Sequence, residues 1–282
     1  MFNKESYFIK QFIKSKYIGD DGAVIGNYVY SMDAFFENVH FKEKWMSLKQ
    51  IAIKSMLVNI SDAIVMNAIP KYALLSVAIP KEFTKKDLKE LSSGFKKVAK
   101  KYNIEIIGGD TISNTKLDIS VTIISKIKKD TKPTLRDGAK LDDIVCHTGT
   151  LGTVKKDLDL LLSDKKISKK SKFITPKLND KFFYKIAPYI TTAMDISDGL
   201  YFELERLSKQ NNIGFDFNQK IKKSIGCSGE EYEILFTFNP KYKKKIEKIA
   251  SKYKVDLNMF ATVTKGQFSC PCVEHHFKGK NK

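Results

Sequence analysis

Several aspartates in this 282-residue sequence stand where their neighbours are apolar. Asp33, Asp110 and Asp195 each follow a short apolar segment, and Asp62 lies on the apolar stripe of a helical pattern. A carboxylate in apolar surroundings loses its hydration, and it is tolerated when it is paired or bound to a cation. These positions therefore predict a site at which an ion compensates gathered negative charge.

The side-chain chemistry indicates which ion this would be. Asp20 and Asp21 lie in a glycine-flanked turn, and Asp198 follows Asp195 after two residues. All of these groups offer oxygen, without histidine or cysteine among them. Oxygen ligands are preferred by hard cations. The pattern predicts magnesium first.

Each aspartate also has an ordinary structural explanation. Asp21 could be a turn residue, Asp62 could form a hydrogen bond within its helix, and Asp110 could cap a helix or form a turn after two glycines. For a single residue the ordinary explanation is preferable. Recurrence at strand ends, where active sites of mixed sheets form, favours the metal site.

The common nucleotide-binding motifs are missing from the sequence. It contains no G-x-x-x-x-G-K-[ST] segment and no G-x-G-x-x-G segment after a strand. The protein-kinase signatures are also missing. A nucleotide would have to be bound by another architecture.

Hydrophobic periodicity predicts the elements that position these residues. In the first half we expect helices over 5–17, 47–66 and 84–102. Expected strands are 28–33, 72–79, 104–107 and 117–127, and the segment 108–110 (GGD) follows the third of them. This order predicts a sheet with helices packed on one side.

The second half repeats the mixture of strands and helices after a polar segment, 128–143, which is the best candidate hinge. We expect an exposed loop over 163–180 and helices over 199–210 and 240–253. Expected strands are 144–147, one ending at Asp195, 213–217, 232–238 and 255–263. The length favours two domains, residues 1–137 and 138–282.

The formal charge of +18 raises the possibility of nucleic-acid binding. The excess is lysine, and Arg136 and Arg206 are the two arginines. Base recognition relies on arginine, so solvated lysine-rich faces are the better explanation, and nucleic acid is not expected as a partner. A basic surface would still attract anionic nucleotides.

Composition also bears on the compartment. No run of about 18 apolar residues predicts a membrane span, and the N-terminus lacks a secretory pattern. Four cysteines do not make a disulfide framework, which favours a reducing cytoplasm. Cys270 and Cys272, with His275 and His276, could form a soft-metal site, but reduced thiols are the preferred interpretation.

A series of segments in a fixed order resembles the thiamine-monophosphate kinase family, in the aminoimidazole ribonucleotide synthetase-like superfamily. The resemblance covers roughly residues 15 to 240. The segments are 19–23 (GDDGA), 31–33 (SMD), 39–41 (VHF), 58–62 (VNISD), 107–111 (IGGDT), 147–152 (HTGTLG), 195–200 (DISDGL) and 229–233 (GEEYE). Each segment is unspecific alone, and their order makes the resemblance specific.

The resemblance implies a mixed α/β fold. An N-terminal ferredoxin-like sheet-and-helix domain would dimerise through its strands, and an α/β domain would follow it. The implied activity is magnesium-dependent transfer of a phosphoryl group from ATP to thiamine monophosphate by a homodimer. No general base is expected, because a phosphate monoester, with a second pKa of about 6, is already nucleophilic at neutral pH.

The resemblance also implies the residues of the site. The magnesium residues would be Asp21, Ser31, Met32 (through its carbonyl), Asp33, Asp62, Asp110, Asp195 and Asp198. ATP would contact Gly109, Asp110, Arg136 and Ser197. Thiamine monophosphate would contact His40 and Glu230.

The sequence departs from the family pattern at several places. Ser93 stands where relatives often have a tyrosine near adenine, and Ser228 replaces a glycine before Gly229. The aromatic residue that would cover the thiamine rings is not evident, and Phe277 or His275 are the candidates.

Four alternatives remain open. The chain could be another enzyme of the superfamily, making selenophosphate or an aminoimidazole ring. The first would usually carry an N-terminal reactive cysteine, whereas Cys146 is the earliest cysteine. The second would be expected to lack the segment 229–233. Outside this superfamily, a nucleic-acid-binding protein or an inactive scaffold remains.

Overall fold

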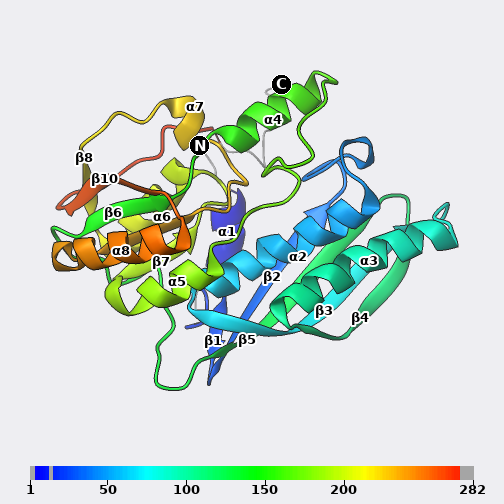
Figure 1. The fold of residues 1–282 in the computed structure, drawn as a ribbon, viewed down its shortest axis with the longest axis horizontal. Helices are drawn as coiled ribbons and strands as arrows, with labels where there is room; N and C mark the ends of the chain where they lie inside the picture. Colours follow the sequence, from blue (N-terminus) through cyan, green and yellow to red (C-terminus); the bar gives the residue numbers. More distant parts are fainter. Residues whose placement is uncertain (1–3, 13–14, 274–282) are drawn as a thin grey trace.

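The computed structural model describes residues 4–12 and 15–273, and its strands form two five-stranded sheets (Figure 1). The first sheet has the order β1-β2-β5-β3-β4 and the second the order β7-β9-β6-β10-β8. The first contains β1 (Ala23–Ile25), β2 (Tyr28–Phe36), β3 (Ala68–Pro80), β4 (Glu105–Asn114) and β5 (Asp118–Ile127). The second contains β6 (Ile144–Thr148), β7 (Thr192–Asp195), β8 (Gly214–Phe217), β9 (Ile234–Phe238) and β10 (Leu257–Thr264).

The first sheet carries two long helices on one face, as the sequence predicts. These are α2 (Leu48–Val65) and α3 (Lys85–Tyr102), which cross the sheet side by side in Figure 1. A short helix, α1 (Lys4–Lys10), and a 3-10 turn, η1 (Glu43–Trp45), complete this half. The strands pair antiparallel, except that β3 and β4 are parallel.

Helix α2 is buried on almost all sides. It begins at Ser47, whose hydroxyl accepts from the Gln50 amide while the Gln50 side chain accepts from the Ser47 amide. It packs against the sheet and α3, and against α5 and β7 of the second half. A helix covered in this way carries apolar residues around its circumference. The polar side chains of α2 are therefore candidates for a role in the functional site.

Helix α3 has one buried stripe and an exposed lysine-rich face. Leu91, Phe95 and Val98 pack inward. Gly94 allows the close approach to α2, because a Cβ there would lie 2.4 Å from the Lys49 carbonyl oxygen. Glycine is therefore required at position 94 by the packing of α3 on α2.

Strand β4 corrects one prediction. The sequence predicts a strand ending at residue 107, but β4 continues through the glycines to Asn114. Gly109 has a φ of +145°, and a Cβ there would lie 1.7 Å from the Leu75 carbonyl oxygen. The glycine thus admits close pairing of β4 with β3.

The face of the first sheet opposite α2 and α3 carries exposed apolar side chains. Side chains alternate between the faces of a strand, and the pairing of β2, β5, β3 and β4 sets Ala34, Ser120, Ser76 and Asp110 in one row. We call this surface the open face. Its large apolar members are Tyr30, Met32, Phe36, Tyr72, Leu74 and Ile112.

The second sheet is antiparallel throughout. Its strands confirm the predicted segments, with small shifts at their ends. Its helices are α4 (Thr153–Leu162), α5 (Asp180–Ile186), α6 (Leu200–Asn211), α7 (Lys223–Gly226) and α8 (Lys243–Tyr253), with 3-10 turns η2 (Ala187–Tyr189) and η3 (Pro240–Tyr242). The sequence predicts α6 and α8 but misses α4, α5 and α7.

One apolar cluster extends through both halves. It joins Ile60 and Val121 of the first half to Phe182 and Phe236 of the second. The Tyr184 hydroxyl also donates to the Ala68 carbonyl. The halves are therefore packed together, and the domain boundary after residue 137 stays a prediction.

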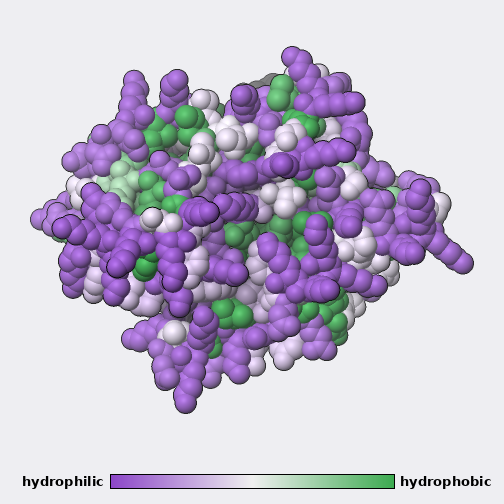
Figure 2. Space-filling model, in the orientation of Figure 1, coloured by the Kyte–Doolittle hydropathy of each residue, from purple (hydrophilic) through white to green (hydrophobic). Residues whose placement is uncertain are grey.

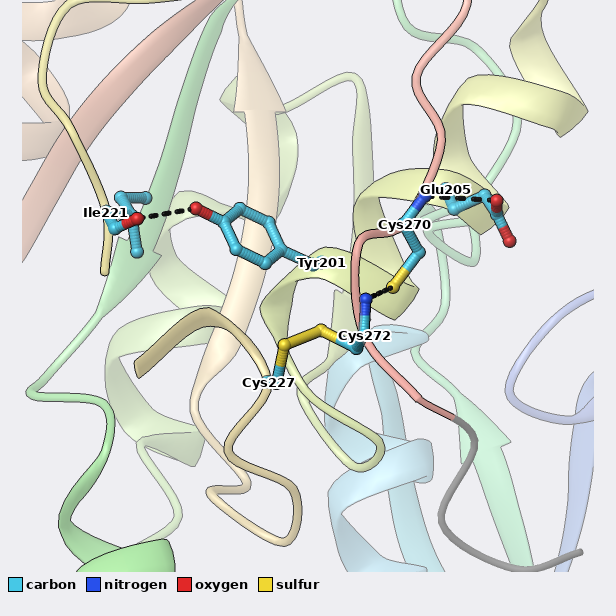
Figure 3. Close-up of a disulfide and its surroundings, with 6 residues drawn as sticks. All are labelled: Tyr201, Glu205, Ile221, Cys227, Cys270 and Cys272. Carbon is cyan, nitrogen blue, oxygen red and sulfur yellow. Dashed lines mark hydrogen bonds between the residues drawn. A yellow bond between two sulfur atoms is a disulfide. The ribbon is translucent and has the colours of Figure 1, made fainter. Parts of the chain in front are cut away.

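The cysteine prediction is wrong at two positions. Cys227 and Cys272 form a disulfide, with Cα atoms 5.7 Å apart (Figure 3). Cys270 is a free thiol that accepts from the Cys272 amide. The Tyr201 ring lies against Gly226 and also against Phe268, which brings the segments that carry Cys227 and Cys272 together. His275, His276 and Phe277, invoked for metal binding or for the thiamine rings, lie outside the described residues.

The surface agrees with the composition. The face in Figure 2 is mostly hydrophilic, with small apolar areas between charged side chains. Among the described residues, no helix combines the length and the apolar character that a bilayer crossing requires.

Candidate functional site

Three predicted aspartates converge where the two halves meet. One carboxylate oxygen from each of Asp21, Asp62 and Asp195 lies within 4.8 Å of the other two. Asp195 is 2% exposed. The central prediction of the sequence, that distant aspartates meet, is confirmed for these three, and we call them the aspartate cluster.

Each member of the aspartate cluster is positioned by a different element. Asp21 lies in the turn before β1, Asp62 lies in the last turn of α2, and Asp195 is the last residue of β7. Because α2 packs against β7, the end of the helix and the end of the strand meet. The cluster therefore depends on how the two halves pack.

Asp33 extends the acidic site. Burial, followed by the charges of Asp21 and Asp198, raises its pKa to about 6. Burial likewise raises the pKa of Asp62 well above its ordinary value, and the charges of Asp33 and Asp195 add to it. The pKa of Asp195 is also raised well above its ordinary value, first by burial and then by Asp21. This environment favours a bound cation.

The donor chemistry fits magnesium. The Ser61 hydroxyl bonds to the Asp195 carboxylate, but Asp195 Oδ2 is a buried oxygen without a hydrogen-bond partner among the described residues. Buried polar atoms ordinarily have partners. An oxygen-only donor set with an unsatisfied lone pair suits a hard divalent ion.

Arg136 partly neutralises one edge of the cluster. Its Nη2 donates to Asp21 Oδ1 at 2.6 Å and its Nε donates to Asp21 Oδ2 at 3.3 Å. Its backbone amide donates to Asp20 Oδ1 at 2.7 Å. One guanidinium beside several carboxylates leaves the site with excess negative charge.

Ser197 and Asp198 lie in the turn after β7, and a second cation, Arg206, holds Asp198. Arg206 of α6 donates to Asp198 Oδ2 at 2.5 Å and to Glu203 Oε2 at 2.6 Å. The fully buried Glu203 accepts from the Asp198 amide at 3.0 Å. The turn is therefore held rigidly beside the aspartate cluster.

Ser31 and Met32 have different orientations on β2. Ser31 is buried, and its hydroxyl bonds to Asn59 Oδ1 of α2 at 2.6 Å. Met32 lies on the open face and is 64% exposed. The Met32 side chain therefore points away from the aspartate cluster.

Asp110 is not brought to the cluster within one chain. It lies on the open face, whereas Asp33 lies on the face toward α2. Its strand, β4, is three positions from β2 in the sheet, or about 14 Å at the usual strand spacing. Gly109, its neighbour, contacts Leu75.

His40 and Glu230, the predicted substrate contacts, lie at two ends of one packed group. His40 Nδ1 accepts from the Phe36 amide at 3.0 Å, and its ring stacks on Phe35 at 5.5 Å. Glu230 accepts from Lys54 Nζ at 2.9 Å. Lys54 Nζ in turn lies over the Phe35 ring.

Several charged residues of the site are not among those that the sequence predicts. Lys54 interrupts an apolar helical run, which is a signal that could have been used. Arg206 is one of two arginines, and it follows the predicted metal turn 195–198 by eight residues, about two helical turns. Glu203, one turn before it, carries no comparable signal.

A second group of carboxylates, Glu231 and Glu233, lies beside α4 and was also missed. Lys172 bonds to both at 2.9 Å. Glu231 Oε1 accepts from the amides of Gly152 and Val154 and from the Ser228 hydroxyl. We call these two glutamates the glutamate pair.

Comparisons with known proteins agree with the geometry. Residues 19–127 match the family model described as AIR synthase related protein, N-terminal domain. The chain is 39% identical over 153 residues to thiamine-monophosphate kinase of Bacillus subtilis, an alignment covering 52% of this chain and 47% of that protein. It is 31% identical over 280 residues to thiamine-monophosphate kinase of Buchnera aphidicola subsp. Acyrthosiphon pisum, covering 88% and 84%.

The fold is also shared with solved structures. AaThiL complexed with AMPPCP and TMP superposes with a TM-score of 0.81 at 25% identity, over 95% of this chain and 94% of that one. The aspartate cluster, the order of the motifs and the near full-length similarity point to one conclusion. The chain belongs to the thiamine-monophosphate kinase family.

Proposed function

We propose that this protein transfers the γ-phosphoryl group of ATP to thiamine monophosphate, giving thiamine diphosphate and ADP. The observation that carries the proposal is the aspartate cluster, in a chain similar to thiamine-monophosphate kinases over most of its length. We assign the reaction to the cytoplasm, where ATP is available.

The reaction joins two polyanions, and its difficulty is electrostatic. The acceptor phosphate has a second pKa of about 6, so near neutral pH it is largely dianionic and is itself the nucleophile. Positioning and charge neutralisation then account for most of the catalysis. Bound magnesium would supply the positive charge that draws phosphate oxygens together.

The acidic residues have distinct roles in this proposal. Asp21, Asp62 and Asp195 would hold the magnesium ions, with Asp33 and Asp198 at the border of the same site. Ser31 would hold β2 against α2 through its hydrogen bond to Asn59. Met32 would bind magnesium through its backbone carbonyl alone. The oxygen-only donor set and the unsatisfied Asp195 oxygen support this assignment.

ATP would lie along the edge formed by Arg136 and Ser197. Arg136 already bonds to Asp21, so its guanidinium lies beside the aspartate cluster. Ser197 lies in the turn after β7, two residues from Asp195. Gly109 and Asp110 are the other predicted ATP contacts, and they lie on the outer strand. Thiamine monophosphate would contact His40 and Glu230.

We also propose that the protein forms a homodimer through the open face. An unpartnered sheet face with several large apolar side chains is an interaction surface. A second copy would cover it with the same residues, as a two-fold interface requires. Dimerisation would use the first domain, residues 1–137, with residues 138–282 outside the contact.

The dimer would also explain Asp110. Within one chain, Asp110 faces away from the aspartate cluster, so one subunit cannot use its own Asp110 there. Because Asp33 lies on the opposite face of the sheet, a partner seated on the open face would have to bring its Asp110 to the site past the β1 edge, where Asp21 lies. ATP would then bind close to the subunit interface.

The test is a direct assay. The purified chain is incubated with magnesium chloride, ATP and thiamine monophosphate, and thiamine diphosphate is measured by separation of the thiamine phosphates. We expect product that depends on all three components and disappears with a chelator. A properly folded protein that makes no thiamine diphosphate would refute the proposal. Asp33→Asn is the matched variant, and we expect it to lose activity while keeping its fold.

A further inference from the structure

Lys54 is a fully buried lysine in the middle of α2, with an exposed fraction of 0%. Buried lysines are rare unless they are paired. Lys54 Nζ donates to Glu230 Oε2 at 2.9 Å, and the Glu230 side chain is 24% exposed. The pair therefore reaches from the core of the first half to the border of the substrate site.

The ammonium group also lies between two aromatic rings. Its Nζ is 4.2 Å from the centroid of Phe173 and 5.5 Å from that of Phe35. Cations are attracted to ring faces, and more so away from water. Phe173 comes from the loop 163–179, so Lys54 connects α2 to that loop and to β2.

The same group supports the second predicted substrate contact. Phe35, beneath the Lys54 ammonium, stacks on the His40 ring at 5.5 Å and on Phe41 at 5.0 Å. His40 and Glu230 are 190 residues apart in the sequence. They are nevertheless connected through Phe35 and Lys54, so one buried cation underlies both contacts.

Glu230 itself has a demanding backbone conformation. Its φ is +57°, in the left-handed region that non-glycine residues seldom adopt. Its amide donates to the Ser197 carbonyl at 2.5 Å, and its carboxylate is held by Lys54. Such a conformation persists when its surroundings fix it, and it is common at ligand sites.

Resting on the proposed function, we propose that Lys54 is a positioning residue for thiamine monophosphate, and that it acts by holding the Glu230 carboxylate. Because Nζ is buried, Lys54 does not touch the substrate. Its bond occupies Glu230 Oε2, so the carboxylate presents Oε1 to the ligand. The same ammonium keeps the Phe35 ring in place under His40.

Stability alone is a weak reason for this lysine. Burying a charge costs free energy, and an apolar side chain of similar volume often stabilises a core as well. Methionine at this position would keep contact with Phe35 and Phe173 but could not hold Glu230. Lys54→Met therefore separates packing from positioning.

The experiment measures KM for each substrate separately. Lys54→Met is expected to raise KM for thiamine monophosphate by about tenfold, the effect of losing one charge-assisted hydrogen bond of about 1.4 kcal/mol. The KM for ATP is expected to change by less than about twofold, because Lys54 holds the Glu230 carboxylate, whereas Ser197 is held by the Glu230 backbone amide. Lys49→Met, at an exposed position of the same helix, is the control and should leave both values unchanged.

A double variant distinguishes positioning from other roles. If Lys54 acts through Glu230, Lys54→Met should add no further increase in the KM for thiamine monophosphate in a Glu230→Gln background. Independent, multiplying effects would overturn the inference, as would equal changes in both KM values. Calorimetric titration with thiamine monophosphate should give the same pattern in binding.

Folding is checked by thermal melts of each variant. If Lys54→Met does not fold, Lys54→Gln is used in the same cycle, and failure of both to fold would overturn the positioning role in favour of a structural one. A wild-type chain without thiamine diphosphate synthesis refutes the proposed function. An active wild-type chain with an unaffected Lys54→Met variant refutes this inference alone.

Discussion

The aspartate cluster and the glutamate pair are both groups of buried carboxylates, but their surroundings differ. Glu231 and Glu233 share the Lys172 ammonium, and Glu231 also accepts from two amides and a hydroxyl. Glu233 accepts in addition from the Thr148 hydroxyl. The glutamate pair is saturated with donors supplied by the chain itself.

The aspartate cluster is not saturated in this way. Within the cluster, Asp21 forms an ion pair with Arg136. Asp195 has a carboxylate oxygen without a hydrogen-bond partner among the described residues. Two of its members have pKa values well above the ordinary range. Carboxylates whose hydrogen-bond donors all come from the chain therefore form a structural group. Carboxylates that lack enough donors form a group suited to binding an external cation.

The largest effect should come from neutralising the aspartate cluster. Asp62→Asn keeps the volume of the side chain but removes an oxygen ligand and a charge, so we expect kcat/KM to fall by about 10³-fold or more. Without magnesium the melting temperature should be unchanged or higher, because buried repulsion is relieved. Activity within tenfold of the wild type would mean that Asp62 is not a metal ligand.

Asp110 should have the next largest effect, although it lies in neither group. If it reaches the site from the partner, Asp110→Asn should lower kcat/KM by about 10²-fold. Mixing Asp62→Asn with Asp110→Asn subunits should then restore about a quarter of wild-type activity, because half of the dimers are mixed and each has one intact site. No recovery in subunits shown to exchange would mean that Asp110 does not act at the partner's site.

Substitution in the glutamate pair should lower the stability of the fold more than the activity of the folded protein. Glu231→Ala leaves the Lys172 ammonium and two buried amides with fewer acceptors, so we expect a loss of about 2–4 kcal/mol of unfolding free energy in urea denaturation. Glu247→Ala, at an exposed site on α8, is the control. Activity per folded molecule should fall less than for Asp62→Asn. The opposite order would overturn the distinction between the groups.

The smallest effect should be a pH-dependent response to magnesium. Asp33 has a pKa of about 6 in the folded chain against an ordinary 3.8, so the folded state binds more protons. The metal-free protein should therefore lose stability as pH rises from about 4 through about 6. Added magnesium should raise the melting temperature by a few degrees more at about pH 7.5 than at about pH 5. Equal shifts at both values would contradict this electrostatic account.

Much of the site could be predicted from sequence because its carboxylates stand out in apolar segments. Asp62 and Asp195 are recognisable for this reason, and the packing of α2 on β7 brings them together. The orientation of Asp110 could not be predicted, because the continuation of β4 through Gly108 and Gly109 depends on close pairing with Leu75 of β3.

The residues that support the site were harder to predict. Lys54 and Glu230 are 176 residues apart, and their ion pair depends on how the two halves pack. The helices α4 and α5 border a lysine-rich loop whose polarity hides their short periodic patterns. Tertiary packing determines these features, whereas local sequence determines the long helices and the strand ends.

The Cys227–Cys272 disulfide, with a sequence separation of 45, encloses β9, α8 and β10 in a covalent ring. A protease that cut the backbone once between these cysteines would leave both fragments joined, and a reducing agent would be needed to separate them. The ring also ties residue 272 to the segment that packs on Gly199. A nicked molecule would thus keep its last described residues close to the turn that carries Asp198.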